Sequence, residues 1–328
     1  MVDLVGIVLD ARFRVESLVG DARVGGHVYR ACDVENGTPY AVRTLGGEIT
    51  EEGLLAWERE AALLSRVAEE TADAERLVAH GVARGVAYCV FEWLEGESLE
   101  AHLAASGGHA RSIGDAITIL EPAARALATA HAIGVTHGDI RPATLWLAFS
   151  DGRTRMKVTQ FTLASRLGGE DPSFAAPYGA PEHFKRSYGP IAPPTDAYAL
   201  ALTFMEVVAG RRVMTSDDPA ELYLAVSDIK KRPSLRAMGV QVSDAVEAVL
   251  ETALAVDPKR RYPDVPAFWA ALARALPELT PAVPSVGARS EIVAALPDRS
   301  GRTAWILVAI VAAAASAVVA AKILRGAP

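Results

Sequence analysis

The chain has 328 residues, a net charge of −7, and 51% hydrophobic against 22% charged residues, a globular rather than a disordered composition. That length exceeds what one small core usually serves, so it predicts two lobes or domains. The acidic balance, without a long Lys/Arg cluster, argues against a nucleic-acid binder. Cys32 and Cys89 have neither the spacing of a zinc site nor that of a disulfide framework, so no metal site is expected.

The first 95 residues predict strands and one helix. Apolar and polar residues alternate in several short runs, as in half-buried strands, and Asn36 with Gly37 between two runs is a strong hairpin signal. Apolar residues near helical spacing, Leu54 and Leu55 among them, predict a helix over 51–67. Strands are expected over 13–19, 27–32, 40–45 and 77–94.

From about Gly96 the sequence predicts helices. Ser112 followed by Asp115 is typical of a capped helix start. Further helices are expected over 195–210, 242–256 and 267–276. Residues 277–302 are rich in Pro, Ala, Ser and Gly without periodicity, which predicts a flexible linker.

Residues 304–321 carry no charge, and Ser316 is their only polar residue. As a helix this run is about 27 Å long, close to the hydrocarbon thickness of a bilayer. Trp305 at one end and Lys322 at the other are typical of interfacial anchors. We therefore expect a transmembrane helix over 303–324, with an Ala-rich soluble helix as the alternative.

The order of motifs over about residues 8–276 resembles the bacterial Ser/Thr protein kinase family. His137–Thr144, with the sequence HGDIRPAT, resembles the catalytic loop, and YGAPE at 178–182 resembles the end of the activation segment. The resemblance implies an α+β, bilobal protein kinase-like fold, with a small β-rich N-lobe at 1–95 and a helical C-lobe at 96–276. The linker and the transmembrane helix would follow it.

The chemical positions of the family are altered. Gln160-Phe-Thr stands where a kinase has Asp-Phe-Gly, so the carboxylate that holds magnesium between the ATP phosphates is missing. Thr144 replaces the asparagine that binds a second magnesium, and Arg141 replaces a lysine. Asp139 matches the catalytic base. Gly138 and Ala175 replace the family's loop arginine and its substrate-platform threonine.

The nucleotide-binding positions are only partly kept. Gly20 and Gly26 match the first and last glycines of the phosphate loop, six residues apart instead of five and without a middle glycine. Arg43 replaces the strand lysine, and Glu60 matches the helix glutamate that pairs with it. The resemblance assigns the adenine slot to Val28, Ala41, Phe91 as gatekeeper, Glu92, Trp93, Leu94 and Leu145.

Structural marks of the family persist. The resemblance implies that Glu182 pairs with Arg261, and that Asp196 caps the backbone of the catalytic loop. The departures from the family's motifs lie at positions that take part in phosphoryl transfer, whereas the charges retained in the pair Glu182–Arg261 and in Asp196 have structural roles. No cofactor is indicated with certainty; binding of ATP with little or no magnesium stays open.

These residues predict a membrane-anchored pseudokinase that serves as a signalling scaffold or regulatory binding module. Its partner would be a protein of a signalling pathway, such as another kinase or its substrate. One alternative is an active atypical Ser/Thr kinase that uses Asp139. Another is a small-molecule phosphotransferase, because His-Gly-Asp also occurs in antibiotic kinases. Without an N-terminal export signal, we expect a tail-anchored inner-membrane protein with its kinase-like domain in the cytoplasm.

Overall fold

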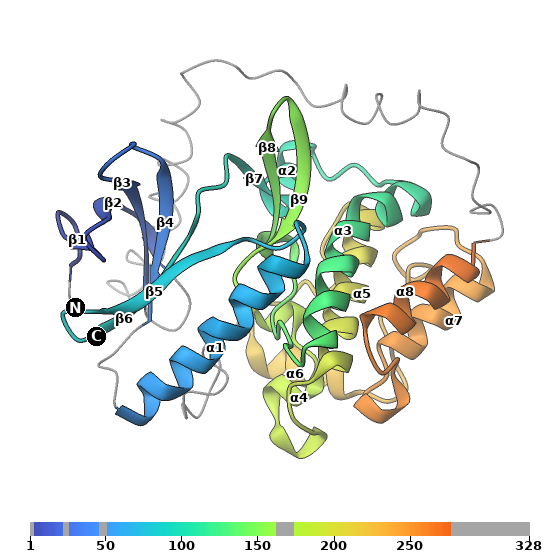
Figure 1. Cartoon of the computed structure of the whole chain (residues 1–328). Coiled ribbons are helices and arrows are strands. Elements are labelled where there is room, and N and C mark those ends of the chain that lie inside the picture. Colours follow the sequence, from blue (N-terminus) through green and yellow to red (C-terminus); the bar gives the residue numbers. More distant parts are fainter. Residues whose placement is uncertain (1–2, 22–25, 46–50, 162–173, 277–328) are drawn as a thin grey trace, which may run out of the picture. The chain divides into compact units, whose positions relative to one another are not determined.

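A computed structural model describes residues 3–21, 26–45, 51–161 and 174–276 of the chain. Within these residues, a β-rich N-lobe is followed by a helical C-lobe, in agreement with the bilobal prediction (Figure 1). The predicted linker and the predicted membrane span lie outside the described residues.

The N-lobe is built on one antiparallel sheet of six strands in the order β1-β2-β3-β4-β6-β5. Gly37, with a φ of +73°, turns the chain between β3 and β4, as the hairpin signal predicted. Arg84 and Gly85, also at positive φ, make the turn between β5 and β6. The strands are β1 (Val8–Leu9), β2 (Phe13–Asp21), β3 (His27–Asp33), β4 (Pro39–Thr44), β5 (Leu77–Ala83) and β6 (Val86–Glu92).

Helix α1 (Glu51–Glu70) contacts β5 and places one apolar stripe in the core. Trp57, Ala61, Leu64 and Val67 are buried in this stripe. Leu55 is 56% exposed, so its inclusion in the predicted stripe was wrong. The reason is geometric: at 100° per residue, Leu55 lies nearly opposite Trp57, which the prediction had left out.

The C-lobe packs around α5 (Pro193–Ala209), which is buried on nearly all sides. It contacts α3 (Ile113–Ala132), α7 (Asp244–Ala253) and α8 (Val265–Arg274), and it lies between α3 and α8 in Figure 1. Ser112 caps α3 by accepting a hydrogen bond from the Asp115 N–H. The remaining helices are α2 (Leu99–Ala105), α4 (Pro181–Phe184) and α6 (Pro219–Ser227), with 3₁₀ turns at Pro142–Thr144, Ala176–Tyr178, Arg186–Tyr188 and Pro258–Arg260.

A second sheet interrupts the region that was predicted to be helical. It contains β7 (Gly96–Ser98), β8 (Leu145–Ser150) and β9 (Arg153–Val158), all antiparallel. Asp151 and Gly152 both have positive φ, as a two-residue hairpin turn of type I′ requires. Because β8 begins next to Thr144 and β9 ends two residues before Gln160, this hairpin brings those two positions to one end of the sheet.

The segment between α1 and β5 is bonded to β9. Val158 donates its N–H to the Asp73 carbonyl at 2.7 Å, and Glu75 donates its N–H to the Val158 carbonyl at 2.9 Å. The Asp73 carboxylate also forms a salt bridge with Arg125 of α3, with Nε 2.9 Å from Oδ2. These bonds fix Glu75 beside the chain that leads to Gln160.

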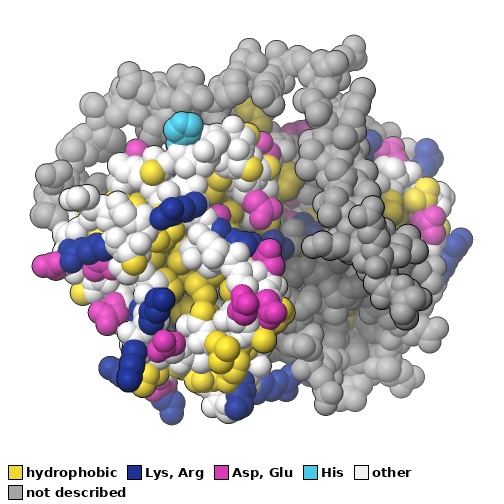
Figure 2. Space-filling model, turned by 180° about the vertical axis from the view of Figure 1, so that it is seen from behind, with side chains coloured by type: hydrophobic (Ala, Val, Ile, Leu, Met, Phe, Trp, Pro, Cys, Tyr) yellow, Lys and Arg dark blue, Asp and Glu magenta, His cyan; other side chains and the backbone are white. Residues whose placement is uncertain are grey.

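In the ranges that the structure covers, no helix is both long and apolar enough to cross a membrane. On the face shown in Figure 2, basic and acidic side chains are interspersed among hydrophobic ones. The described residues on that face therefore form no basic stripe of the kind that binds nucleic acid.

Candidate functional site

The loop after α3 is held by a buried carboxylate from α5. Asp196 is fully buried, and its two oxygens accept the N–H groups of His137 and Gly138, each at 2.8 Å. His131 Nε2 lies 2.9 Å from Asp196 Oδ2. The structure therefore places Asp196 where the sequence expected it, as a cap of the catalytic-loop backbone.

Asp139 is buried, and both of its carboxylate oxygens already accept hydrogen bonds. The Ala175 N–H donates to Oδ1 at 2.8 Å, and the Arg141 Nε–H donates to Oδ2 at 3.0 Å. A general base must accept a hydrogen bond from the hydroxyl that it activates. A substrate hydroxyl would therefore share the carboxylate with Ala175 and Arg141, since each oxygen has a second lone pair.

Thr144 faces its own loop. Its hydroxyl oxygen lies 3.2 Å from the Asp139 carbonyl and 3.0 Å from the Arg141 carbonyl, and it accepts the Arg141 N–H at 3.2 Å. Its side chain is fully buried. The Thr144 hydroxyl, which stands at the position of the family's second metal ligand, thus forms hydrogen bonds within its own loop.

Gln160 lies just beyond β9 with a backbone φ of +61°. Its backbone N–H donates to Glu75 Oε1 at 2.6 Å. The side-chain amide offers one uncharged carbonyl oxygen where a kinase has a carboxylate. In the described part of the chain, no three His, Cys, Asp or Glu residues lie close enough together to hold a metal ion.

Arg43 on β4 forms a bidentate ion pair with Glu75, a residue that the sequence analysis had not singled out. Its Nη1 donates to Oε1, and its Nη2 donates to Oε2 at 2.6 Å. The guanidinium also lies over the Phe91 ring, 4.5 Å from the centroid. Glu60, the partner expected from the sequence, lies on α1, but its side chain is outside the described residues.

Most residues assigned to the adenine slot lie on neighbouring strands. In the sheet register, Val28 on β3 is opposite Arg43 on β4, and Ala41 on β4 is opposite Phe91 on β6. Phe91 is buried, as is Leu145 at the start of β8. Gly20 ends up in strand β2, Gly26 precedes β3, Leu94 follows β6, and Glu92 is paired with Lys157 of β9.

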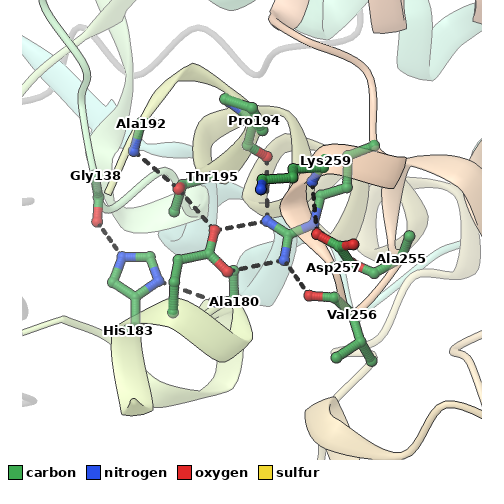
Figure 3. A network of polar contacts seen from close by, with 12 residues as sticks. Gly138, Ala180, His183, Ala192, Pro194, Thr195, Ala255, Val256, Asp257 and Lys259 are labelled. Atoms are coloured by element: carbon green, nitrogen blue, oxygen red, sulfur yellow. Dashed lines mark hydrogen bonds and ion pairs between the residues drawn. The ribbon is translucent and has the colours of Figure 1, made fainter. Parts of the chain in front are cut away.

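Glu182 and Arg261 form a second bidentate pair, in the C-lobe (Figure 3). Nη1 donates to Oε1 at 2.6 Å and Nη2 donates to Oε2 at 2.8 Å, and both side chains are fully buried. Arg261 also donates to the carbonyls of Ala255, Val256 and Pro194. Burial alone would raise the pKa of Glu182, but the hydrogen bonds and charge of Arg261 hold it below its usual value.

His183 joins the end of the activation segment to the catalytic loop, and the sequence analysis had missed it. Its Nδ1 accepts the Ala180 N–H at 3.0 Å, so Nε2 carries the proton and donates to the Gly138 carbonyl at 2.8 Å (Figure 3). Burial lowers the pKa of His183, outweighing that carbonyl and the nearby carboxylates. The only sequence feature that could have drawn attention to His183 was its position directly after Ala-Pro-Glu.

Comparison with known proteins places this geometry in a family. Residues 13–268 match the model of the protein kinase domain, so the chain belongs to the protein kinase family. The Ser/Thr kinase PknA of Mycobacterium tuberculosis is 28% identical over 271 residues, covering 79% of this chain and 60% of PknA. PknA of Corynebacterium glutamicum is 28% identical over 272 residues, covering 78% of this chain and 54% of that protein.

Solved structures agree on the fold. The PknI kinase domain of Mycobacterium tuberculosis superposes with a TM-score of 0.65 at 23% identity, covering 84% of this chain and all of that domain. The family model confirms the predicted protein kinase family, and the relatives described above are bacterial Ser/Thr kinases. The chain spans little more than half the length of the PknA proteins.

The family uses ATP with magnesium, but the residues described here do not fit that group. Gln160 offers a metal only an uncharged amide oxygen in place of the family's carboxylate, and the Thr144 hydroxyl is turned into its loop. Arg43, at the position of the phosphate-binding lysine, is paired with Glu75. A phosphate would have to compete with the Glu75 carboxylate for that guanidinium.

Proposed function

We propose that this chain is a pseudokinase that serves as a signalling scaffold or regulatory binding module. The observation that carries the proposal is the altered metal positions, with Gln160 uncharged and the Thr144 hydroxyl bonded within its own loop. Phosphoryl transfer depends on metal ions that neutralise the developing charge, so their loss removes the main catalytic contribution. The partner is a protein of a signalling pathway, such as another kinase or its substrate.

The direct test is a phosphotransfer assay on the full-length chain with labelled ATP, magnesium or manganese, and generic protein acceptors. We expect no incorporation above that of an Asp139→Ala variant. Asp139-dependent labelling at ordinary ATP concentrations would contradict the proposal. It would favour the alternative, an atypical Ser/Thr kinase that transfers the γ-phosphate with Asp139 as base.

One observation speaks for that alternative. Asp139 is retained, and Arg141 lies 3.0 Å from it, a basic group at the position of the family's lysine. The two readings differ in one measurable way, because only an active enzyme loses product formation when Asp139 is replaced.

We further propose that residues 303–324 anchor the protein in the inner membrane with the kinase domain in the cytoplasm. The support comes from the sequence: residues 304–321 carry no charge and match a bilayer in length. The full-length chain should stay with membranes washed in carbonate, whereas a chain truncated at Arg302 should be soluble. A soluble full-length chain, or digestion of the domain by protease added outside spheroplasts, would contradict the anchor.

A further inference from the structure

Glu75 is paired with Arg43, the cation at the position where the family's lysine contacts the phosphates of a nucleotide. Arg43 and Glu75 share two parallel N–H···O contacts, the same fork that a guanidinium offers to a phosphate. The two N–H groups that hold the Glu75 carboxylate cannot hold a phosphate at the same time. The charge of Arg43 is therefore balanced from within the protein.

Contacts of both Arg43 and Glu75 with the surrounding structure hold the ion pair in place. Arg43 is anchored in β4 and lies over the Phe91 ring. Glu75 is bonded through its backbone to Val158, and its Oε1 also accepts the Gln160 N–H at 2.6 Å. The Glu75 side chain is 3% exposed, so water has little access to its carboxylate.

Displacing Glu75 is consequently unfavourable for a nucleotide. The phosphates would approach a carboxylate of their own charge sign, at close range and in a poorly hydrated place. Freeing Arg43 would leave Glu75 buried without its cation, which is the costly way to break a buried ion pair. An uncharged nucleoside avoids both penalties, because it has no phosphate that would bind Arg43.

We propose that Glu75 sets the ligand class of this site: it excludes nucleotide phosphates by taking their place on Arg43, so that any purine bound is an uncharged base or nucleoside. The inference deepens the proposed pseudokinase function and rests on it. It assigns Glu75 a role as an internal anion that determines specificity.

The first test needs no variant. Binding of adenosine, AMP, ADP and ATP to the full-length chain is measured by calorimetry, with and without magnesium. We expect affinity that stays level or falls as phosphates are added. A tenfold or greater gain from adenosine to ADP would overturn the proposal.

The second test releases Arg43. Glu75→Gln keeps an oxygen for the Gln160 N–H but removes the charge, and Glu97→Gln, an exposed glutamate on β7, is the matched control. We expect Glu75→Gln to bind ADP or ATP at least tenfold more tightly than the wild type, with adenosine unchanged. The Glu97→Gln chain should behave as the wild type.

The gain must depend on Arg43. In Glu75→Gln combined with Arg43→Met, the phosphate-dependent gain should disappear; its persistence would overturn the proposal. So would a folded Glu75→Gln chain that gains no affinity for phosphates, whether or not the wild type binds adenosine. If Glu75→Gln does not fold, the series of four ligands on the wild type decides alone.

Failure here differs from failure of the pseudokinase proposal. A chain that binds ATP through Arg43 but transfers no phosphate keeps the pseudokinase and loses the role of Glu75. Asp139-dependent phosphotransfer overturns the pseudokinase itself.

Discussion

Two arginine–glutamate pairs of the same geometry stand in different surroundings. In the C-lobe pair, Arg261 and Glu182 are fully buried, and Thr195 and three backbone carbonyls take up the remaining hydrogen bonds. In the N-lobe pair, the Arg43 side chain is 21% exposed and lies against the single ring of Phe91. The comparison teaches that the same ion pair is suited to holding a lobe together where every donor is paired, and to the proposed control of ligand access where one partner keeps contact with water.

The largest effect is expected for Glu182→Ala. It leaves Arg261 charged and buried without its anion, which destabilises a protein by about 3–5 kcal/mol. The measurement is chemical denaturation, with Glu251→Ala on the exposed face of α7 as control, expected to change stability by about 0.5 kcal/mol or less. A loss below about 1 kcal/mol for Glu182→Ala would show that the C-lobe pair is not structural.

Glu75→Ala should cost less, about 1–3 kcal/mol. Three N–H donors, two on Arg43 and one on the Gln160 backbone, lose their acceptor, but water can reach the partly exposed guanidinium. The same denaturation experiment compares the two variants directly. Equal losses for Glu75→Ala and Glu182→Ala would remove the distinction drawn between the pairs.

His183 predicts a pH dependence. Because burial lowers its pKa in the folded state, the unfolded chain takes up this proton first, and folding stability falls as pH drops below the unfolded value of about 6.5. His183→Gln, which still donates to Gly138 but does not titrate, should flatten the profile between about pH 7.5 and 5.5. The carboxylate of Glu182 contributes only at lower pH, since its pKa is also lowered.

The control for this prediction is His80→Gln, at an exposed position on β5. Its unfolding free energy should follow the wild-type profile over the same range. An unchanged profile in His183→Gln would indicate that another group sets the pH response.

The smallest effect is expected for Gln160→Ala. The backbone N–H of Gln160, which bonds Glu75, remains, and only a partly exposed amide is lost. Stability should change by about 0.5 kcal/mol or less. A loss comparable to that of Glu75→Ala would reveal a task for the Gln160 side chain within the site.

Much of the fold was predictable from local patterns. The strands around Gly37 and the helix capped by Ser112 depend on short-range signals, and both appear in the structure. The sheet of β7, β8 and β9 was missed although Asp151-Gly152 is a hairpin signal, because the apolar run at 145–149 before that turn also suits a helix. Short apolar runs are ambiguous in this way.

The candidate site was predictable where a motif fixes the partner and not elsewhere. Glu182 and Arg261 are 79 residues apart, yet the family pattern names both. Glu75 carries no such mark: it follows a turn, and its contact with Arg43 depends on the bonds between its own backbone and Val158. A contact made by tertiary structure alone leaves no periodicity or spacing in the sequence.

The inward hydroxyl of Thr144 has a consequence for exchanges at this position. The hydroxyl lies close to the Asp139 and Arg141 carbonyls and accepts the Arg141 N–H. Replacing it by the family's asparagine would therefore change the hydrogen bonds within the loop as well as the groups offered to a metal. Residue 144 is thus coupled to the shape of the loop, whether or not the site binds a metal.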